Sequence, residues 1–268
     1  MIKQPLCSTC GTQFPPGEPL PELCPICNDD RQYVNLNGQS WTELVAVNKN
    51  YGLKVNRLHD NLYDLTMAPG FGIGQRAFLI ITPEGNILWD CIPLISEAVI
   101  EFIKGKGGLT AIAFSHPHYY STMNEWAAIF NCPVFIHKND GEYIVYKGDH
   151  IRLWEGNNKT LPGGVTIHHT GGHFAGSCVL HVPSVSPKGA LLVGDTMQIA
   201  LSKRHIAVMY SYPNHIMLPK NEFLSFHKKT VGLDFDLMYG AFAWQNLTEN
   251  AKVIFDMSMQ RYLESYGI

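Results

Sequence analysis

The 268-residue sequence has no apolar run long enough to cross a membrane, and its first residues lack the apolar centre of a secretory signal. Basic residues never form a block longer than two. The chain has 20 Lys and Arg and 23 Asp and Glu, which gives a net charge of −3. These absences predict a cytoplasmic location and no nucleic-acid or membrane partner. A hydrophobic fraction of 46% still provides for a large core.

A disulfide framework is also missing. Four of the seven cysteines lie within the first 27 residues. The other three, Cys91, Cys132 and Cys178, lie in apolar runs, where a free thiol usually packs as a small hydrophobic group. Thiols kept reduced in this way agree with the cytoplasmic location.

The four early cysteines form two Cys-x-x-Cys turns on either side of a proline-rich stretch, residues 15–21. Such turns let four thiolates converge on one soft metal ion, and a segment this short has little core of its own. We therefore predict a structural zinc site at Cys7, Cys10, Cys24 and Cys27. Rubredoxin's iron site has similar turns, so the sequence leaves zinc and iron open. Residues 1–35 are assigned to this segment and residues 36–268 to the main domain.

A short apolar strand predicted for residues 109–115 leads directly into His116-Pro117-His118. Residues two apart in an extended chain point to the same side, so the two imidazoles can reach one ion. A helix predicted over residues 122–130 follows, which places the pair at the carboxyl end of a strand, where open α/β sheets often build their sites. The alternative is one packed and one solvated histidine.

The remaining chain alternates predicted strands and helices, which is typical of an α/β fold. Strands are predicted at residues 58–67 and 190–194, and a hairpin turns at residues 83–86. A terminal helix is predicted over residues 246–266. Its buried face is expected to carry Val253, Ile254, Met257 and Leu263.

Two later features can join the histidine pair. His173 lies in a glycine-rich turn, where backbone freedom lets a side chain swing toward a site. Asp195 directly follows the apolar strand at residues 190–194, where a cation would relieve the cost of an unpaired carboxylate. His205 and His215 follow in a segment rich in Tyr, Met and Pro, and either is a further candidate to complete the site.

These motifs, in this order and in these strand contexts, resemble the metallo-β-lactamase superfamily from about Leu58 to the C-terminus. The resemblance implies an α/β fold, a four-layer αββα metallo-β-lactamase-like sandwich, preceded here by the small N-terminal zinc-binding segment. It implies that His116, His118 and His173 bind a first metal and that Asp195 is a carboxylate ligand able to bridge to a second. Zn²⁺, or Fe or Mn, is the expected ion at the three-His site.

The chain departs from the family pattern at the second metal. Tyr120 and Ser121 stand where the family has Asp and His, and the segment around Ala241 lacks the family's last His. We therefore expect a second ion to bind poorly or not at all. Asp195 and Tyr120 are the candidate catalytic residues; Tyr119 and Tyr120 could each offer a phenol, with aromatic packing as the alternative.

The predicted function is metal-dependent hydrolysis of a small ester, thioester, lactone or amide-like substrate. Three histidines with an open fourth position suit catalytic zinc, which lowers the pKa of a bound water toward about 7. The alternative is a catalytically inactive metal-binding or ligand-sensing module of the same fold. Family members that pair rubredoxin-type turns with iron reduce oxygen species, but they carry a flavin domain for which 268 residues leave no room.

Overall fold

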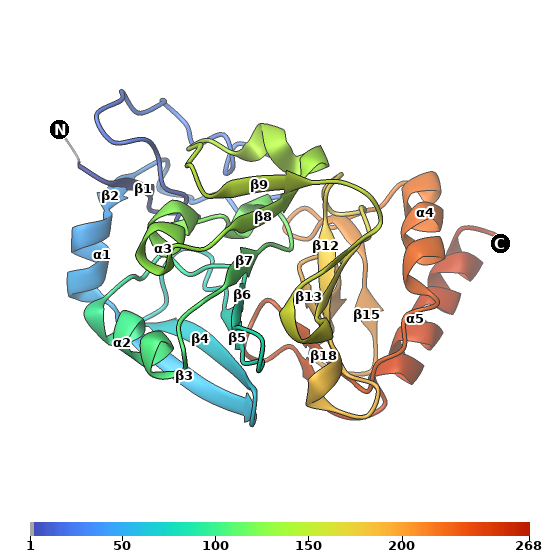
Figure 1. Ribbon diagram of the computed structural model, residues 1–268. Helices are drawn as coiled ribbons and strands as arrows, with labels where there is room; N and C mark the ends of the chain where they lie inside the picture. The colour runs from blue at the N-terminus through green and yellow to red at the C-terminus, as the bar shows by residue number, and fades with distance from the viewer. Residues whose placement is uncertain (1–2) are drawn as a thin grey trace.

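Two β-sheets packed face to face, with helices on both outer faces, form the main body of the protein in the computed structural model, which describes residues 3–268 (Figure 1). The first sheet runs β3 (Gly52–His59), β4 (Leu62–Ala68), β5 (Ala77–Ile80), β6 (Ile87–Trp89), β7 (Ala111–Ala113), β8 (Val134–His137) and β9 (Ile151–Trp154). The second runs β10 (Asn158–Thr160), β11 (Thr166–His169), β12 (Cys178–Val182), β13 (Ala190–Gly194), β18 (Leu237–Gly240) and β19 (Asn246–Leu247). The four-layer αββα sandwich is confirmed.

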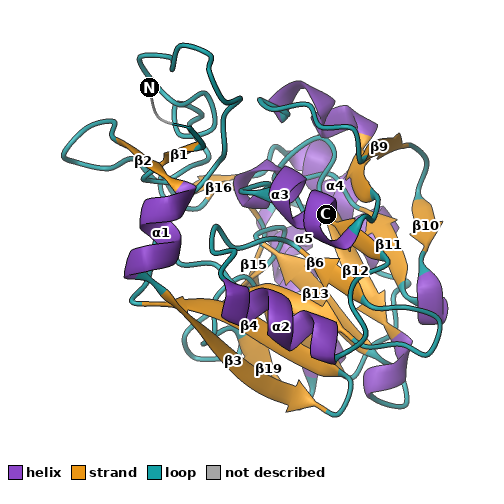
Figure 2. Cartoon of the chain, turned by 60° about the vertical axis from the view of Figure 1, so that its left-hand side comes forward, coloured by secondary structure: helices purple, strands orange, loops and turns teal. Residues whose placement is uncertain are grey.

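Alternation along the strands explains the layers of the first sheet. Leu79, Leu88 and Ile112 face outward and pack with the buried sides of α2 (Glu97–Gly105) and α3 (Met123–Phe130). Their neighbours along the strands, such as Phe78 and Trp89, face the second sheet. Figure 2 shows α2 lying across this sheet. Each large apolar side chain buried in this way contributes roughly 1.5–3 kcal/mol.

The second sheet follows the same rule on the opposite side. Leu191 and Val193 of β13 face α4 (Lys220–Thr230) and α5 (Ala251–Ser265), whereas Leu192 between them faces the first sheet. The two helices lie together at the right of Figure 1. Two short hairpins connect β13 to α4, and they consist of β14 (Gln198–Ile199), β15 (Ile206–Ala207), β16 (Met209–Ser211) and β17 (Ile216–Met217).

The single strand expected at residues 58–67 is wrong, because this stretch contains a turn. β3 ends at His59 and β4 begins at Leu62, so the polar pair Asp60 and Asn61 connects two antiparallel strands. Asp and Asn favour turns because their short side chains hydrogen-bond to nearby backbone groups. The hairpin expected around residues 83–86 is confirmed as β5 and β6.

The terminal helix begins later than expected and buries only part of the expected face. β19 occupies residues 246 and 247, and α5 starts at Ala251. Phe255 and Met259 are buried in α5, and Ile254 and Leu263 pack partly buried against the same cluster. Val253 and Met257 are 56% and 55% exposed. The helix carries two apolar stripes, and the stripe with the larger aromatic ring faces the sheet.

The N-terminal segment lies against one end of the sandwich, at the upper left of Figure 1. β1 (Pro5–Cys7) pairs with β2 (Trp41–Glu43), and α1 (Leu44–Asn50) follows. The 3₁₀ turns are η1 (Pro117–Tyr119), η2 (Lys138–Tyr143), η3 (Pro162–Gly164) and η4 (Pro183–Val185). Within residues 3–268, no helix has the length and apolar character needed to cross a membrane.

Candidate metal centre

The four early cysteines converge in the N-terminal segment. The Sγ atoms of Cys7 and Cys27 are 3.6 Å apart, and those of Cys10 and Cys24 are 3.8 Å apart. Zinc–sulfur bonds of about 2.3 Å in a tetrahedron place neighbouring sulfurs about 3.8 Å apart, whereas a disulfide needs about 2.05 Å. The four side chains therefore fit a tetrahedral thiolate site, and their spacing does not fit paired disulfides.

A second cluster joins His116, His118, His173 and Asp195, whose ligand atoms all lie within 4.8 Å of one another. His116 and His118 follow β7 of the first sheet. His173 lies in the loop between β11 and β12, and Asp195 follows β13 of the second sheet. Both sheets thus contribute loops to one edge of the sandwich, which brings together the four residues that the sequence singles out.

Hydrogen bonds to the outer nitrogens orient two of the imidazoles. Ser115 Oγ lies 2.9 Å from an Asp90 carboxyl oxygen and 2.8 Å from His116 Nδ1, so a Ser115 hydrogen directed to Asp90 leaves the hydroxyl to accept from Nδ1–H of His116. Nδ1–H of His173 donates to the carbonyl oxygen of Tyr210 at 2.8 Å. Both rings consequently turn an unprotonated Nε2 toward the cluster, which is the tautomer that a metal ligand needs.

The inner nitrogens have no partner within the described chain. Nε2 of His116 and of His173 is buried without a hydrogen bond, and His118 turns Nδ1 toward Asp195. Buried polar atoms are nearly always satisfied, so two unpartnered acceptor nitrogens directed into one cluster fit a metal cation. Burial lowers the pKa of His116 to about 4 and that of His173 well below its ordinary value, which keeps both rings neutral and ready to ligate.

Asp195 supplies the negative charge of the cluster. Its Oδ2 lies 3.6 Å from His116 Nε2 and 4.0 Å from His118 Nδ1, and its side chain is 17% exposed. One carboxylate with neutral imidazoles suits a divalent cation.

Gly194 fixes the distance between the two sheets at this edge. Its φ is +53°, and a Cβ there would lie 2.4 Å from Ser115 Oγ. The backbone N–H of Cys178 also donates to the Ser115 carbonyl at 2.8 Å. Glycine therefore both adopts the left-handed conformation and leaves room for the hydroxyl that orients His116.

The positions that would hold a second metal serve other purposes. Tyr120 is 3% exposed, and its ring centroid lies 5.1 Å from that of Phe114 in the core. Ser121 Oγ donates to the carbonyl of Gly11, and the Ala241 carbonyl accepts from a backbone N–H. The catalytic role of Tyr120 stays a prediction, and its packing in the core does not favour it.

Tyr119, rather than Tyr120, lies against the cluster. Its ring centroid is 4.4 Å from that of His116, and the side chain is fully buried. Its hydroxyl has no hydrogen-bond partner within residues 3–268. Burial and the nearby Asp195 charge raise the pKa of Tyr119 well above its ordinary value, so the phenol stays protonated as a donor.

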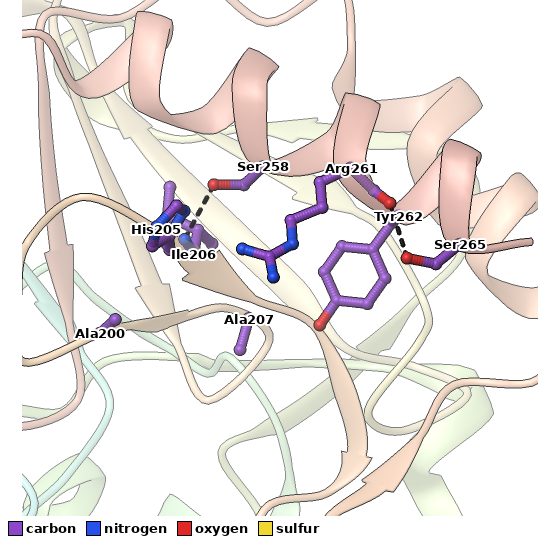
Figure 3. A pocket seen from close by; sticks show the side chains of 8 residues that line it. All are labelled: Ala200, His205, Ile206, Ala207, Ser258, Arg261, Tyr262 and Ser265. Atoms are coloured by element: carbon purple, nitrogen blue, oxygen red, sulfur yellow. Dashed lines mark hydrogen bonds between the residues drawn. The ribbon is translucent and has the colours of Figure 1, made fainter.

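His205 lies apart from the cluster. It lines a cavity of about 200 Å³ beside α5, into which Arg261 points next to Tyr262 (Figure 3). His215 is an exposed residue with a φ of +55° in the turn between β16 and β17. Neither histidine belongs to the group of metal-ligating side chains found in the described chain.

The sequence did not reveal several residues that support the ligands. Ser115 directly precedes His116, and Asp90 follows β6 just as Asp195 follows β13, so strand-end position was an available signal for both. Tyr210 and Arg31 have no comparable local signal. Arg31 contacts the backbone of His173 from 142 residues away in the chain.

Solved structures with a similar fold include several metallo-β-lactamases. VMB-1 is 14% identical with a TM-score of 0.59 over 80% of this chain and 98% of that chain. DIM-1 is 13% identical with a TM-score of 0.58 over 80% and 100%. A B3 metallo-β-lactamase with an active-site glutamic acid is 16% identical with a TM-score of 0.54 over 89% and 97%. The protein therefore has the metallo-β-lactamase fold.

One curated protein gives a sequence-level relationship. The uncharacterized protein YmaE of Bacillus subtilis (strain 168) is 38% identical over 263 residues, which are 97% of this chain and 96% of that protein. The chain belongs to the same protein family as YmaE. No protein-family model matches it.

Proposed function

We propose that the protein is a metal-dependent hydrolase of a small ester, thioester, lactone or amide-like substrate, with one ion at His116, His118, His173 and Asp195. The observation that carries the proposal is the pair of buried, unpartnered Nε2 atoms of His116 and His173, gathered with His118 and the Asp195 carboxylate. Zinc, iron and manganese all accept this donor set. The division at residue 35 and the cytoplasmic location stay predictions.

A divalent ion in this position would polarise a carbonyl and lower the pKa of a water toward about 7. The chain's own residues do the rest. Ser115 and the Tyr210 carbonyl hold two imidazoles in the ligating tautomer. Asp195 is the most exposed member of the cluster, so it is placed to orient an attacking water or to accept its proton. The Tyr119 hydroxyl is buried beside His116 without a partner in the described chain, so it can support the cluster but does not reach the surface.

The test compares Asp195→Asn with the native protein on aryl esters, lactones and thioesters, with zinc, manganese and iron supplied separately. We expect turnover to fall about 10²-fold or more while the three histidines still hold metal. Asp60→Asn is the matched control, because this carboxylate is 97% exposed and lies in the turn between β3 and β4. Activity that survives both chelation and Asp195→Asn would show that this site is not the catalyst.

The second candidate is a metal-binding or ligand-sensing module without turnover. It is favoured by the packing of Tyr120 and by the hydrogen bonding of Ser121 and Ala241, which occupy the second-metal positions. For such a module, Asp195→Asn would change ligand affinity or stability alone. Inactivity of the metal-loaded native protein on every substrate class and metal would favour this candidate.

A further inference from the structure

The loop that follows the second cysteine turn reaches the histidine centre. Arg31 Nη1 donates to the carbonyl oxygen of His173 at 3.3 Å, and Nη2 donates to the Tyr143 hydroxyl at 2.8 Å. Asp29 accepts from Nε and Nη2 of the same guanidinium at 2.7 and 2.6 Å. Asp29 therefore holds the Arg31 guanidinium in one orientation, and the guanidinium in turn holds the backbone of the metal ligand His173.

The same guanidinium covers the ring beneath the ligands. Its Cζ lies 3.8 Å from the centroid of Phe174. The Phe174 ring packs against all three imidazoles, with centroids 4.9 Å from His118, 5.0 Å from His173 and 5.8 Å from His116. Arg31 thus restrains both the backbone of one ligand and the aromatic floor of the whole cluster.

Asp30 acts on the other side of His173. Its carboxylate accepts from the Tyr210 hydroxyl at 2.9 Å, and its backbone carbonyl accepts from Ser211 Oγ and Asn214 Nδ2, both at 2.6 Å. These bonds hold β16, whose Tyr210 carbonyl accepts from His173 Nδ1. The imidazole of His173 is therefore oriented through a residue that the N-terminal loop fixes.

The first cysteine turn contacts the loop of the other two ligands. The backbone N–H of Gln13 donates to the Ser121 carbonyl at 3.1 Å, and Ser121 Oγ donates back to the Gly11 carbonyl at 3.3 Å. Gly11 lies so close to the sandwich that a Cβ there would be 2.4 Å from Pro93 Cγ. The N-terminal segment consequently touches the ligand-bearing loops of both sheets.

The position of this loop depends on the thiolate site. Residues 29–31 begin two positions after Cys27, and the Asn28 N–H donates to the Cys24 carbonyl at 2.9 Å. The apolar cluster around the cysteines adds only Phe14 and Ile26 as buried residues. A segment with so small a core needs its metal to fold.

We propose that Asp30 and Arg31 are positioning residues for His173, and that through them the four-cysteine site sets the metal affinity of the histidine centre. The inference rests on the metal centre of the proposed function and goes beyond it, because it assigns a role to the N-terminal segment. Partners that orient ligands typically contribute 10–100-fold to metal affinity. Loss of the paired hydrogen bonds that the Arg31 guanidinium donates should lower the metal affinity of the histidine centre by about that factor.

The experiment uses the full chain with zinc first bound at the cysteines, followed by cobalt titration of the histidine centre against a chromophoric chelator. Thiolate-to-cobalt absorption distinguishes ions at the cysteines from ions at the histidines. Arg31→Lys keeps the positive charge and loses the fork and the planar stacking. Arg57→Lys is the matched control, because this arginine pairs with Asp60 on the surface, 60% exposed.

We expect Arg31→Lys to weaken cobalt binding at the histidine centre about tenfold or more, with the cysteine site still filled and Arg57→Lys unchanged. Cys24→Ser combined with Cys27→Ser should weaken the same centre. A histidine-centre affinity for Arg31→Lys within about twofold of the native value overturns the inference. Native protein that binds no cobalt at the histidines refutes the metal centre itself, and this result is seen before any substitution is made.

Discussion

Ser115→Ala isolates the hydroxyl that connects a buried carboxylate to a metal ligand. The substitution leaves Nδ1–H of His116 without its acceptor at 2.8 Å, while Asp90 keeps the backbone N–H of residue 115 at 2.8 Å. An unpaired buried donor costs about 1–3 kcal/mol. The His116 ring can then carry its proton on Nε2 instead of Nδ1. Metal binding must move that proton back to Nδ1, so metal affinity should fall roughly 10–100-fold.

The assay is competition for the ion between the protein and a chromophoric chelator, with the cysteine site already filled. Ser258→Ala is the matched control, because Ser258 is 3% exposed, donates to the Ile254 carbonyl and accepts from the Ile206 N–H in a different part of the fold. The control should lower stability and leave metal affinity unchanged. Equal affinities for native protein and Ser115→Ala would refute the assigned tautomer of His116.

Three further predictions concern other parts of the molecule. Cys24→Ser with Cys27→Ser should abolish the thiolate-to-cobalt absorption of cobalt-substituted protein; its persistence would contradict the four-thiolate site. Arg76→Met should destabilise the fold by about 3–5 kcal/mol in urea unfolding, because it leaves the Asp64 carboxylate buried without the cation now 2.9 Å away; a loss below about 1 kcal/mol would contradict this. Burial raises the pKa of Asp140 from the ordinary 3.8 to about 7, so the folded state binds the extra proton and stability attributable to this group falls as pH rises from about 4 to about 7. The unfolding free energy of native protein relative to Asp140→Asn should therefore decrease across that window, by at most about 4 kcal/mol, and a flat difference would refute the buried, neutral carboxyl.

The ligand set was predictable from the sequence because each member stands at a strand end or in a glycine-rich turn. His116 and His118 follow β7, His173 lies in the loop after β11 and Asp195 follows β13, so loops of both sheets carry the four ligands. The α/β character was predictable because strand and helix patterns alternate along the chain. The two-sheet sandwich was predicted through the resemblance to metallo-β-lactamases, and the observed sheets confirm it.

The supporting contacts were not predictable from local patterns. Arg31 reaches His173 across 142 residues, and the Asp30 to Tyr210 bond spans 180. Such contacts depend on how the N-terminal segment packs against the sandwich. No repeating pattern of apolar residues in the sequence predicts that packing. The choice between Tyr119 and Tyr120 depends on the 3₁₀ turn η1, which directs adjacent side chains to different sides.

Two stripes on α5 show where amphipathic patterns mislead. Val253 and Met257 are four residues apart, and so are Phe255 and Met259. From the sequence alone, either stripe could be the face of α5 that packs against the sheet. The larger buried area of the Phe255 ring decides the orientation only once the second sheet is in place.

Metal content per chain tests the central claim most directly. Native protein and a His116→Ala/His118→Ala variant are loaded with zinc, passed over a desalting column and measured by elemental analysis. We expect about two ions per native chain, one at the cysteines and one at the histidines, and about one ion per chain of the variant. Equal metal content in the two proteins would contradict a metal at His116, His118, His173 and Asp195.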